Sequence, residues 1–154
     1  MALGGYTSDL VVGDVLGPLE YTLSPFVVRE YTHAVEIHHP CFQGTEGQVM
    51  PPTLIHLDKL RLYNHACPKG AGSSARIHYE YDAEVFAPVH VGDRLSVRGE
   101  VTERYEKKGR DYVVMTIELK RVETGELLVR YVDRVILAYK PGGGDGDRKS
   151  EEAV

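Results

Sequence analysis

One stretch, residues 50–66 (MPPTLIHLDKLRLYNHA), constrains the fold of this 154-residue chain more than any other. Two consecutive prolines, Pro51 and Pro52, stand where a helix can begin, because the first helical turn does not use the N–H group that proline lacks. Apolar residues then cover more than half of the helix circumference: Leu54, Leu57, Leu60, Leu62, Tyr63 and Ala66. A helix that is apolar on most sides needs protein around most of it. The stretch therefore predicts a buried central helix over 51–66.

From residue 76 onward the chain has the pattern of long strands. Residues 76–86 (RIHYEYDAEVF) alternate without a break, which is typical of a strand. The apolar face would carry Ile77, Tyr79, Tyr81, Ala83 and Val85, and the polar, solvated face His78, Glu80, Asp82 and Glu84. Three more strands are expected, one starting at Leu95 and the others over 112–122 and 126–139. One apolar helix with several long strands predicts an α+β fold, a curved antiparallel sheet wrapped around the helix.

The N-terminal part of the chain has weaker patterns. Residues 11–19 contain two glycines and a proline, which allow at best a short or bent strand. Ser24 can cap a helix and Pro25 can occupy its first position, so a helix is expected over 25–36. Residues 41–48 are Gly-rich and polar, and they predict a loop that leads into the central helix.

Length and composition predict one globular domain over residues 1–140 and a disordered, Gly-rich and charged tail over 141–154. The net charge is −5 and no basic cluster opposes it, so nucleic acid is not expected as the main partner. No apolar run is long enough for a membrane span and no secretory pattern is present, which favours a cytoplasmic protein. Cys41 and Cys67 lack a metal-binding spacing and are expected to be reduced thiols. No cofactor is predicted.

The predicted sheet would have an open edge strand and a partly uncovered apolar face. An open edge presents unpaired N–H and C=O groups, and strand pairing across a two-fold axis covers them. We therefore expect a dimer.

Several segments together resemble one known family. They are YTHAVEIHHP (31–40), MPPTL (50–54) and the long segment EVFAPVHVGDRLSVRGEVTERYEKKGRDYVVMTIELKRVETGELLVRYVDRVILA (84–138). Their order and spacing are similar to those of the MaoC-like hydratase/dehydratase family, and most similar to the half that carries Pro-Pro-Thr at its central helix. The resemblance implies a hot-dog fold, a homodimer or heterodimer of such units, and an acyl thioester ligand on CoA or on an acyl carrier. Family members add water to 2-enoyl thioesters or remove it from 3-hydroxyacyl thioesters.

The catalytic loop of that family, Asp-x-Asn-Pro-x-His, is altered in this chain. Pro40 matches the proline, and His39 stands where asparagine is usual. Ile37 replaces the aspartate and Phe42 replaces the histidine. The usual catalytic pair is therefore missing.

Three neighbouring side chains could replace the missing pair: Glu36, His38 and His39. Hydration needs a base with a pKa near neutrality for the water and a second group at the α-carbon, and histidine with glutamate meets both needs. His38 and His39 would point to different sides of an extended segment, and His39, in the aligned asparagine position, is the favoured one. The alternative is a structural or purely binding loop, in which these side chains only cap backbone groups.

An enolate oxygen would need N–H donors, which a helix start can provide. Pro52 occupies the position of the glycine whose amide serves the family, so the nearest donors are the Thr53 amide and hydroxyl and the Leu54 amide. Thr53 could equally be a simple cap residue. Phe42 is included among the substrate-binding residues.

Other polar residues are weaker candidates. A zinc site at His33, His38 and His39 is not favoured, so no metal is predicted. Cys41 is expected to be a small buried apolar residue. Arg76, Arg94 and Arg98 could meet CoA phosphates or simply be strand-edge charges.

Three functions therefore remain open. The chain could be a hydro-lyase with a rearranged loop at 36–42, or a non-catalytic binding subunit of a heteromeric dehydratase. A hot-dog thioesterase, with Asp58 or Glu46 acting on water, ranks last.

Overall fold

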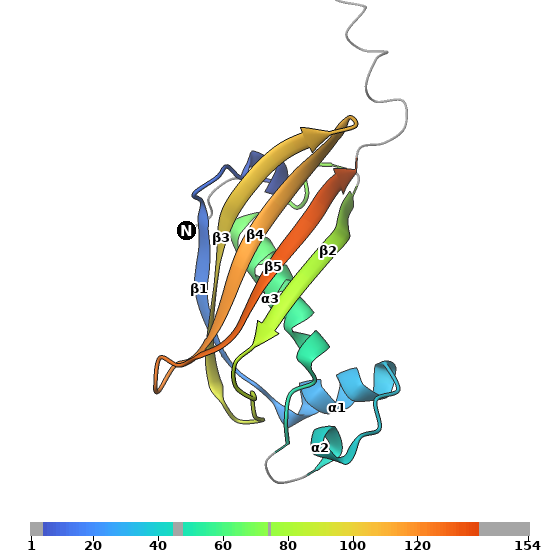
Figure 1. Ribbon diagram of the computed structural model, residues 1–154, viewed down its shortest axis with the longest axis vertical. Coiled ribbons are helices and arrows are strands. Elements are labelled where there is room, and N and C mark those ends of the chain that lie inside the picture. Colours follow the sequence, from blue (N-terminus) through green and yellow to red (C-terminus); the bar gives the residue numbers. More distant parts are fainter. Residues whose placement is uncertain (1–4, 45–47, 74, 139–154) are drawn as a thin grey trace, which may run out of the picture.

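The computed structural model describes residues 5–44, 48–73 and 75–138 of the chain (Figure 1). Five antiparallel strands form one sheet in the order β1-β3-β4-β5-β2. Their bounds are β1 Val15–Thr22, β2 Ala75–Val85, β3 Arg94–Lys107, β4 Arg110–Arg121 and β5 Leu127–Ala138. Within the described ranges, β1 and β2 therefore form the two edges of the sheet.

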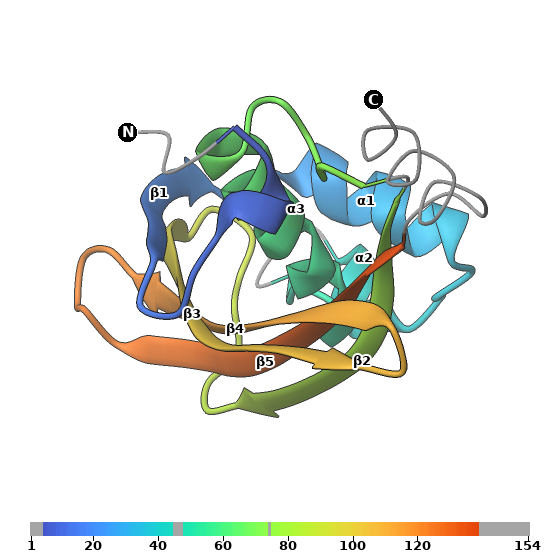
Figure 2. The ribbon, with the colours of Figure 1, turned by 90° about the horizontal axis from the view of Figure 1, so that it is seen from above.

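The central helix lies in the concave face of the curved sheet (Figure 2). It consists of a 3-10 turn, η2 (Pro52–Ile55), continued by α3 (His56–Ala66). Two further helices, α1 (Pro25–Ala34) and α2 (Pro40–Gln43), lie beyond one end of the sheet near the start of η2 (Figure 1). A second 3-10 turn, η1 (Thr7–Asp9), precedes β1.

The predicted elements are present, with corrected bounds. The expected helix over 51–66 begins as a tighter turn, in which the Leu54 N–H donates to the Pro51 carbonyl at 2.9 Å. The helix expected over 25–36 ends at Ala34, because Glu36 adopts a left-handed φ of 56°. Residues 41–48 are not all loop, since α2 begins at Pro40 with His39 as its N-cap. The predicted tail over 141–154 and Glu46 lie outside the described residues.

The register of β2 contradicts the predicted faces of that strand. A β-bulge between His78 and Glu80 interrupts its pairing with β5. One extra residue in a strand exchanges the two faces on one side of the bulge. Tyr81 packs against the core as predicted, whereas Ile77 and Tyr79 are 44% and 55% exposed. His78, expected in solvent, instead turns toward α3.

The Leu62 side chain of α3 packs close to two glycines of the sheet. A Cβ at Gly99 of β3 would lie 2.6 Å from the Met115 Sδ and 3.1 Å from the Leu62 Cδ1. A Cβ at Gly17 of β1 would lie 2.8 Å from the Val97 carbonyl oxygen and 3.1 Å from the Leu62 Cδ2. A side chain at Gly17, where φ is +86°, would meet the backbone of β3, and a side chain at Gly99 would need Met115 and Leu62 to move.

Replacing Gly99 by valine is expected to lower the free energy of unfolding by about 2 kcal/mol, because its side chain overpacks the contact with Leu62 and Met115. Chemical denaturation measures the change. Arg98→Val is the matched control, since Arg98 is exposed on the same strand and valine suits a strand. Equal stability of the two variants would contradict the tight contact.

Candidate functional site

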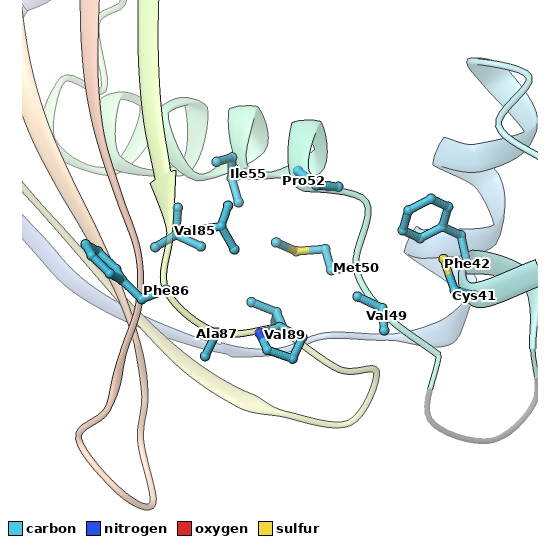
Figure 3. A pocket seen from close by; sticks show the side chains of 12 residues that line it. Cys41, Phe42, Val49, Met50, Pro52, Ile55, Val85, Phe86, Ala87 and Val89 are labelled. Atoms are coloured by element: carbon cyan, nitrogen blue, oxygen red, sulfur yellow. The ribbon is translucent and has the colours of Figure 1, made fainter. Parts of the chain in front are cut away.

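An apolar cavity of about 430 Å³ lies beside the first turn of the central helix (Figure 3). Its walls come from α2, from residues 49–55, from the end of β2 with residues 86–89, and from β5. Representative lining residues are Phe42, Met50, Ile55, Val85, Phe86 and Val129. Cys41 contributes the one polar hydrogen-bonding group among the lining side chains that the structure describes.

Backbone hydrogen bonds hold the walls of this cavity together. The Met50 N–H donates to the Val89 carbonyl at 2.7 Å, and the Val91 N–H donates to the Gln48 carbonyl at 2.9 Å. These bonds join the segment before η2 to the segment after β2, which lies about 40 residues further along the chain. The cavity is thus formed by parts of the chain that are distant in sequence.

The three predicted catalytic side chains lie outside the lining of this cavity. Glu36, His38 and His39 are exposed. His38 lines a separate hollow of about 560 Å³ next to α1, and its Nδ1 accepts a hydrogen bond from the Gln43 side-chain amide at 3.3 Å. Glu36 occupies the left-handed position that ends α1.

His39 instead caps α2. Its Nδ1 accepts a hydrogen bond from the Cys41 N–H at 3.3 Å and lies 2.9 Å from the Cys41 Sγ. Cys41 was expected to be buried, but it is exposed and lines the cavity. The reason is that Cys41 belongs to the short helix α2, which forms one wall of the cavity. Cys67 is buried, and both thiols are free.

The predicted substrate-binding residues divide into two pairs. Pro52 and Phe42 line the cavity. Thr53 and Leu54 are not among the lining residues. The Thr53 Oγ1 accepts a hydrogen bond from the Tyr31 hydroxyl at 2.6 Å, and the Leu54 N–H donates to the Pro51 carbonyl within η2.

Asp58 lies on the flank of α3 that faces β1. Arg61 donates to its Oδ1 at 2.8 Å, and the Arg61 guanidinium carbon lies 3.9 Å from the ring centre of Tyr21. Burial raises the pKa of Asp58 to about 6, against the opposing effects of Tyr21 and Arg61. Asp58 does not line the apolar cavity, so the geometry does not place it where a thioesterase needs its carboxylate.

A second buried polar group occupies the opposite flank of α3. The Lys59 Nζ lies 3.0 Å from the Asp133 Oδ1 of β5 and 2.7 Å from the His78 Nδ1 of β2. Sequence reasoning missed this group. Its signal was a lysine in the predicted buried helix and an aspartate within the last predicted strand.

No group of three His, Cys, Asp or Glu side chains in the described part of the chain is arranged to hold a metal ion. No helix within the described ranges is long and apolar enough to cross a membrane.

Comparisons with known proteins identify the fold. No protein-family model and no curated protein matches the sequence. The solved structure of R-hydratase PhaJ1 from Pseudomonas aeruginosa is 14% identical, with a TM-score of 0.69 over 88% of this chain and 87% of that chain. A MaoC-like dehydratase from Rhodospirillum rubrum is 18% identical, with a TM-score of 0.66 over 90% of this chain and 99% of that chain. This chain has the hot-dog fold.

A heteromeric protein shares the hot-dog fold as well. A chain of the 3R-hydroxyacyl-ACP dehydratase complex HadBC from Mycobacterium tuberculosis is 19% identical, with a TM-score of 0.68 over 82% of this chain and 97% of that chain. The predicted α+β hot-dog fold is therefore confirmed. Function on a shared fold depends on the residues of the site.

The raised pKa of Asp58 predicts a pH dependence of stability. The folded protein binds this proton more tightly than the unfolded chain, so the contribution is fully present below about pH 4 and is lost as the pH rises through about 6. Relative to Asp58→Asn, the wild type should gain up to about 3 kcal/mol between pH 7 and pH 4. Denaturation across this range measures the difference, with Asp82→Asn at an exposed position of β2 as the control. A constant difference between wild type and Asp58→Asn would contradict the assignment.

Proposed function

We propose that this chain is the acyl-binding half of a cytoplasmic hydratase/dehydratase assembly that acts on acyl thioesters of CoA or of an acyl carrier. The observation that carries the proposal is the composition of the apolar cavity. Among the described residues that line it, hydrocarbon and thioether side chains surround the space, the Cys41 thiol is the one polar group, and no carboxylate or imidazole enters it. Such a cavity suits the hydrocarbon part of a substrate and lacks the groups for hydration.

The size and walls of the cavity suit an acyl chain. About 430 Å³ lies within the usual range for small-molecule sites. Each methylene group moved from water into such a space contributes about 0.8 kcal/mol to binding. Phe86 lies on the side of the cavity away from α2 (Figure 3), and Val129 of β5 also lines the cavity. The distal part of the acyl chain would lie against Phe86.

The chemistry would come from a second hot-dog chain. Ile37 and Phe42 stand at the two positions that carry the catalytic pair in the resembling family, and neither side chain can transfer a proton. The edge strand β2 offers a place for pairing, since Ile77 and Tyr79 of this strand are exposed apolar groups. The HadBC complex and the ChsH1-ChsH2 complex from Mycobacterium tuberculosis contain chains of similar fold, which supports such an arrangement.

The alternative is a hydratase that acts alone through its rearranged loop. Its support is the position of α2, because Cys41 and Phe42 of this helix line the cavity. The His39 Nδ1 lies 2.9 Å from the Cys41 Sγ, next to the cavity wall. A thioesterase has no comparable support, because Asp58 is buried on the β1 side of α3.

Purified alone, the chain should bind acyl-CoA and fail to hydrate a 2-enoyl-CoA such as crotonyl-CoA. Co-expression with a hot-dog chain that carries a complete Asp-x-Asn-Pro-x-His loop should give a complex that hydrates crotonyl-CoA. The loss of the enoyl absorbance measures this hydration. His39→Ala in this chain should leave the activity of the complex unchanged. If the chain alone is active and His39→Ala abolishes that activity, the alternative is correct.

Filling the cavity tests the binding role separately. Val85→Trp places a large ring in the cavity at a residue that is 51% exposed, so folding should be preserved. It should weaken binding of octanoyl-CoA at least tenfold, measured by calorimetry. Tyr79→Trp is the matched control, because Tyr79 is exposed on the other face of the same strand. Equal binding by both variants would place the acyl group elsewhere.

A further inference from the structure

A second cavity, of about 370 Å³, lies between α3 and the first half of β2. Lys59 and Tyr63 of α3 line it, together with Arg76 and His78 of β2. Along β2, His78 is seven residues from Val85 of the apolar cavity, a span of roughly 20 Å in a strand. The two cavities are therefore separate, and this one is lined by cationic groups.

The charge of Lys59 is already neutralised. Its Nζ forms an ion pair of 3.0 Å with Asp133, whose side chain is fully buried. The same Nζ lies 2.7 Å from the His78 Nδ1. The same Nδ1 lies 3.1 Å from the Asp133 Oδ1, so it can accept a hydrogen bond from the ammonium group or donate one to the carboxylate. The His78 side chain is 41% exposed on the wall of the cavity.

The charge of Arg76 is not neutralised within the described ranges. Its guanidinium donates to the Thr7 hydroxyl at 3.3 Å and lies 4.8 Å from the ring centre of Tyr63. Neither partner carries a negative charge. Since Lys59 and Asp133 cancel, Arg76 leaves one positive charge on the wall of the cavity.

Tyr63 adds a buried donor without a partner. Its side chain is 1% exposed, and its hydroxyl has no hydrogen-bond partner among the described residues. Burial raises the pKa of Tyr63 well above its usual range, so the hydroxyl keeps its proton. A buried hydroxyl without a partner is costly, and a ligand that accepts its hydrogen bond removes that cost.

We propose that this cavity binds one small oxyanion, a carboxylate or a phosphate group, through the Arg76 guanidinium and the Tyr63 hydroxyl. Guanidinium groups with additional neutral donors are a common means of binding such anions. The site is independent of the acyl-binding function proposed above.

Calorimetry on the full chain tests the proposal with inorganic phosphate and with acetate, at an ionic strength held constant with chloride. We expect saturable binding of one anion per chain. Binding of phosphate only would identify a phosphate site, binding of acetate only a carboxylate site, and binding of both a general oxyanion site. Absence of binding by both anions would overturn the proposal.

Two variants distinguish the cavity from the rest of the surface. Arg76→Gln should lower the affinity at least tenfold. Tyr63→Phe should lower it several-fold without loss of folding stability, because the substitution removes a hydroxyl that has no partner. Arg98→Gln, at an exposed arginine paired with Glu100, should bind as the wild type does. Unchanged affinity in Arg76→Gln and Tyr63→Phe, or an equal loss in Arg98→Gln, would show non-specific attraction and overturn the proposal.

Discussion

The contact between Leu62 of α3 and the glycines of two strands is the constraint on which the rest of the structure depends. Gly17 and Gly99 remove the side chains that would otherwise hold the helix away from the sheet. With the helix at this depth, the sheet can curve around it and exclude water from a single core. The helix start then lies at one end of the sheet, between the ends of β2 and β5 and the segment around Met50, where the apolar cavity forms.

The polar groups of the central helix are separated from this cavity. Asp58 faces Tyr21 and Arg61 on one flank, and Lys59 faces Asp133 and His78 on the other. Adjacent residues of a helix point about 100° apart, so Asp58 turns toward Tyr21 of β1 while Lys59 turns toward β5 and β2. Because a buried charge without its partner is very costly, the Lys59–Asp133 pair between α3 and β5 fixes the rotation of α3 about its axis. Pro52 and Ile55 of η2, which precede α3, line the cavity.

Backbone capping sets the directions of the polar side chains in the loop before the central helix. Glu36, His38 and His39 lie within four residues of one another, and none of them lines the apolar cavity. The left-handed residue Glu36 ends α1, and Pro40 starts α2 with His39 as its cap. Phe42 enters the cavity in their place. Local capping, which satisfies backbone groups, decides these directions before any ligand is considered.

The sequence by itself determined the architecture: an apolar helix after two prolines, long alternating strands, and an α+β fold with the sheet around the helix. Periodicity suffices for these features because each depends on residues close together in the chain. Only the tertiary structure decided the bulge that turns His78 toward α3 and the pairing of Lys59 with Asp133. It also decided the closure of the apolar cavity by segments that precede and follow β2 in the chain. These features depend on contacts between distant segments, and a one-residue change of register reverses the face on which a side chain lies.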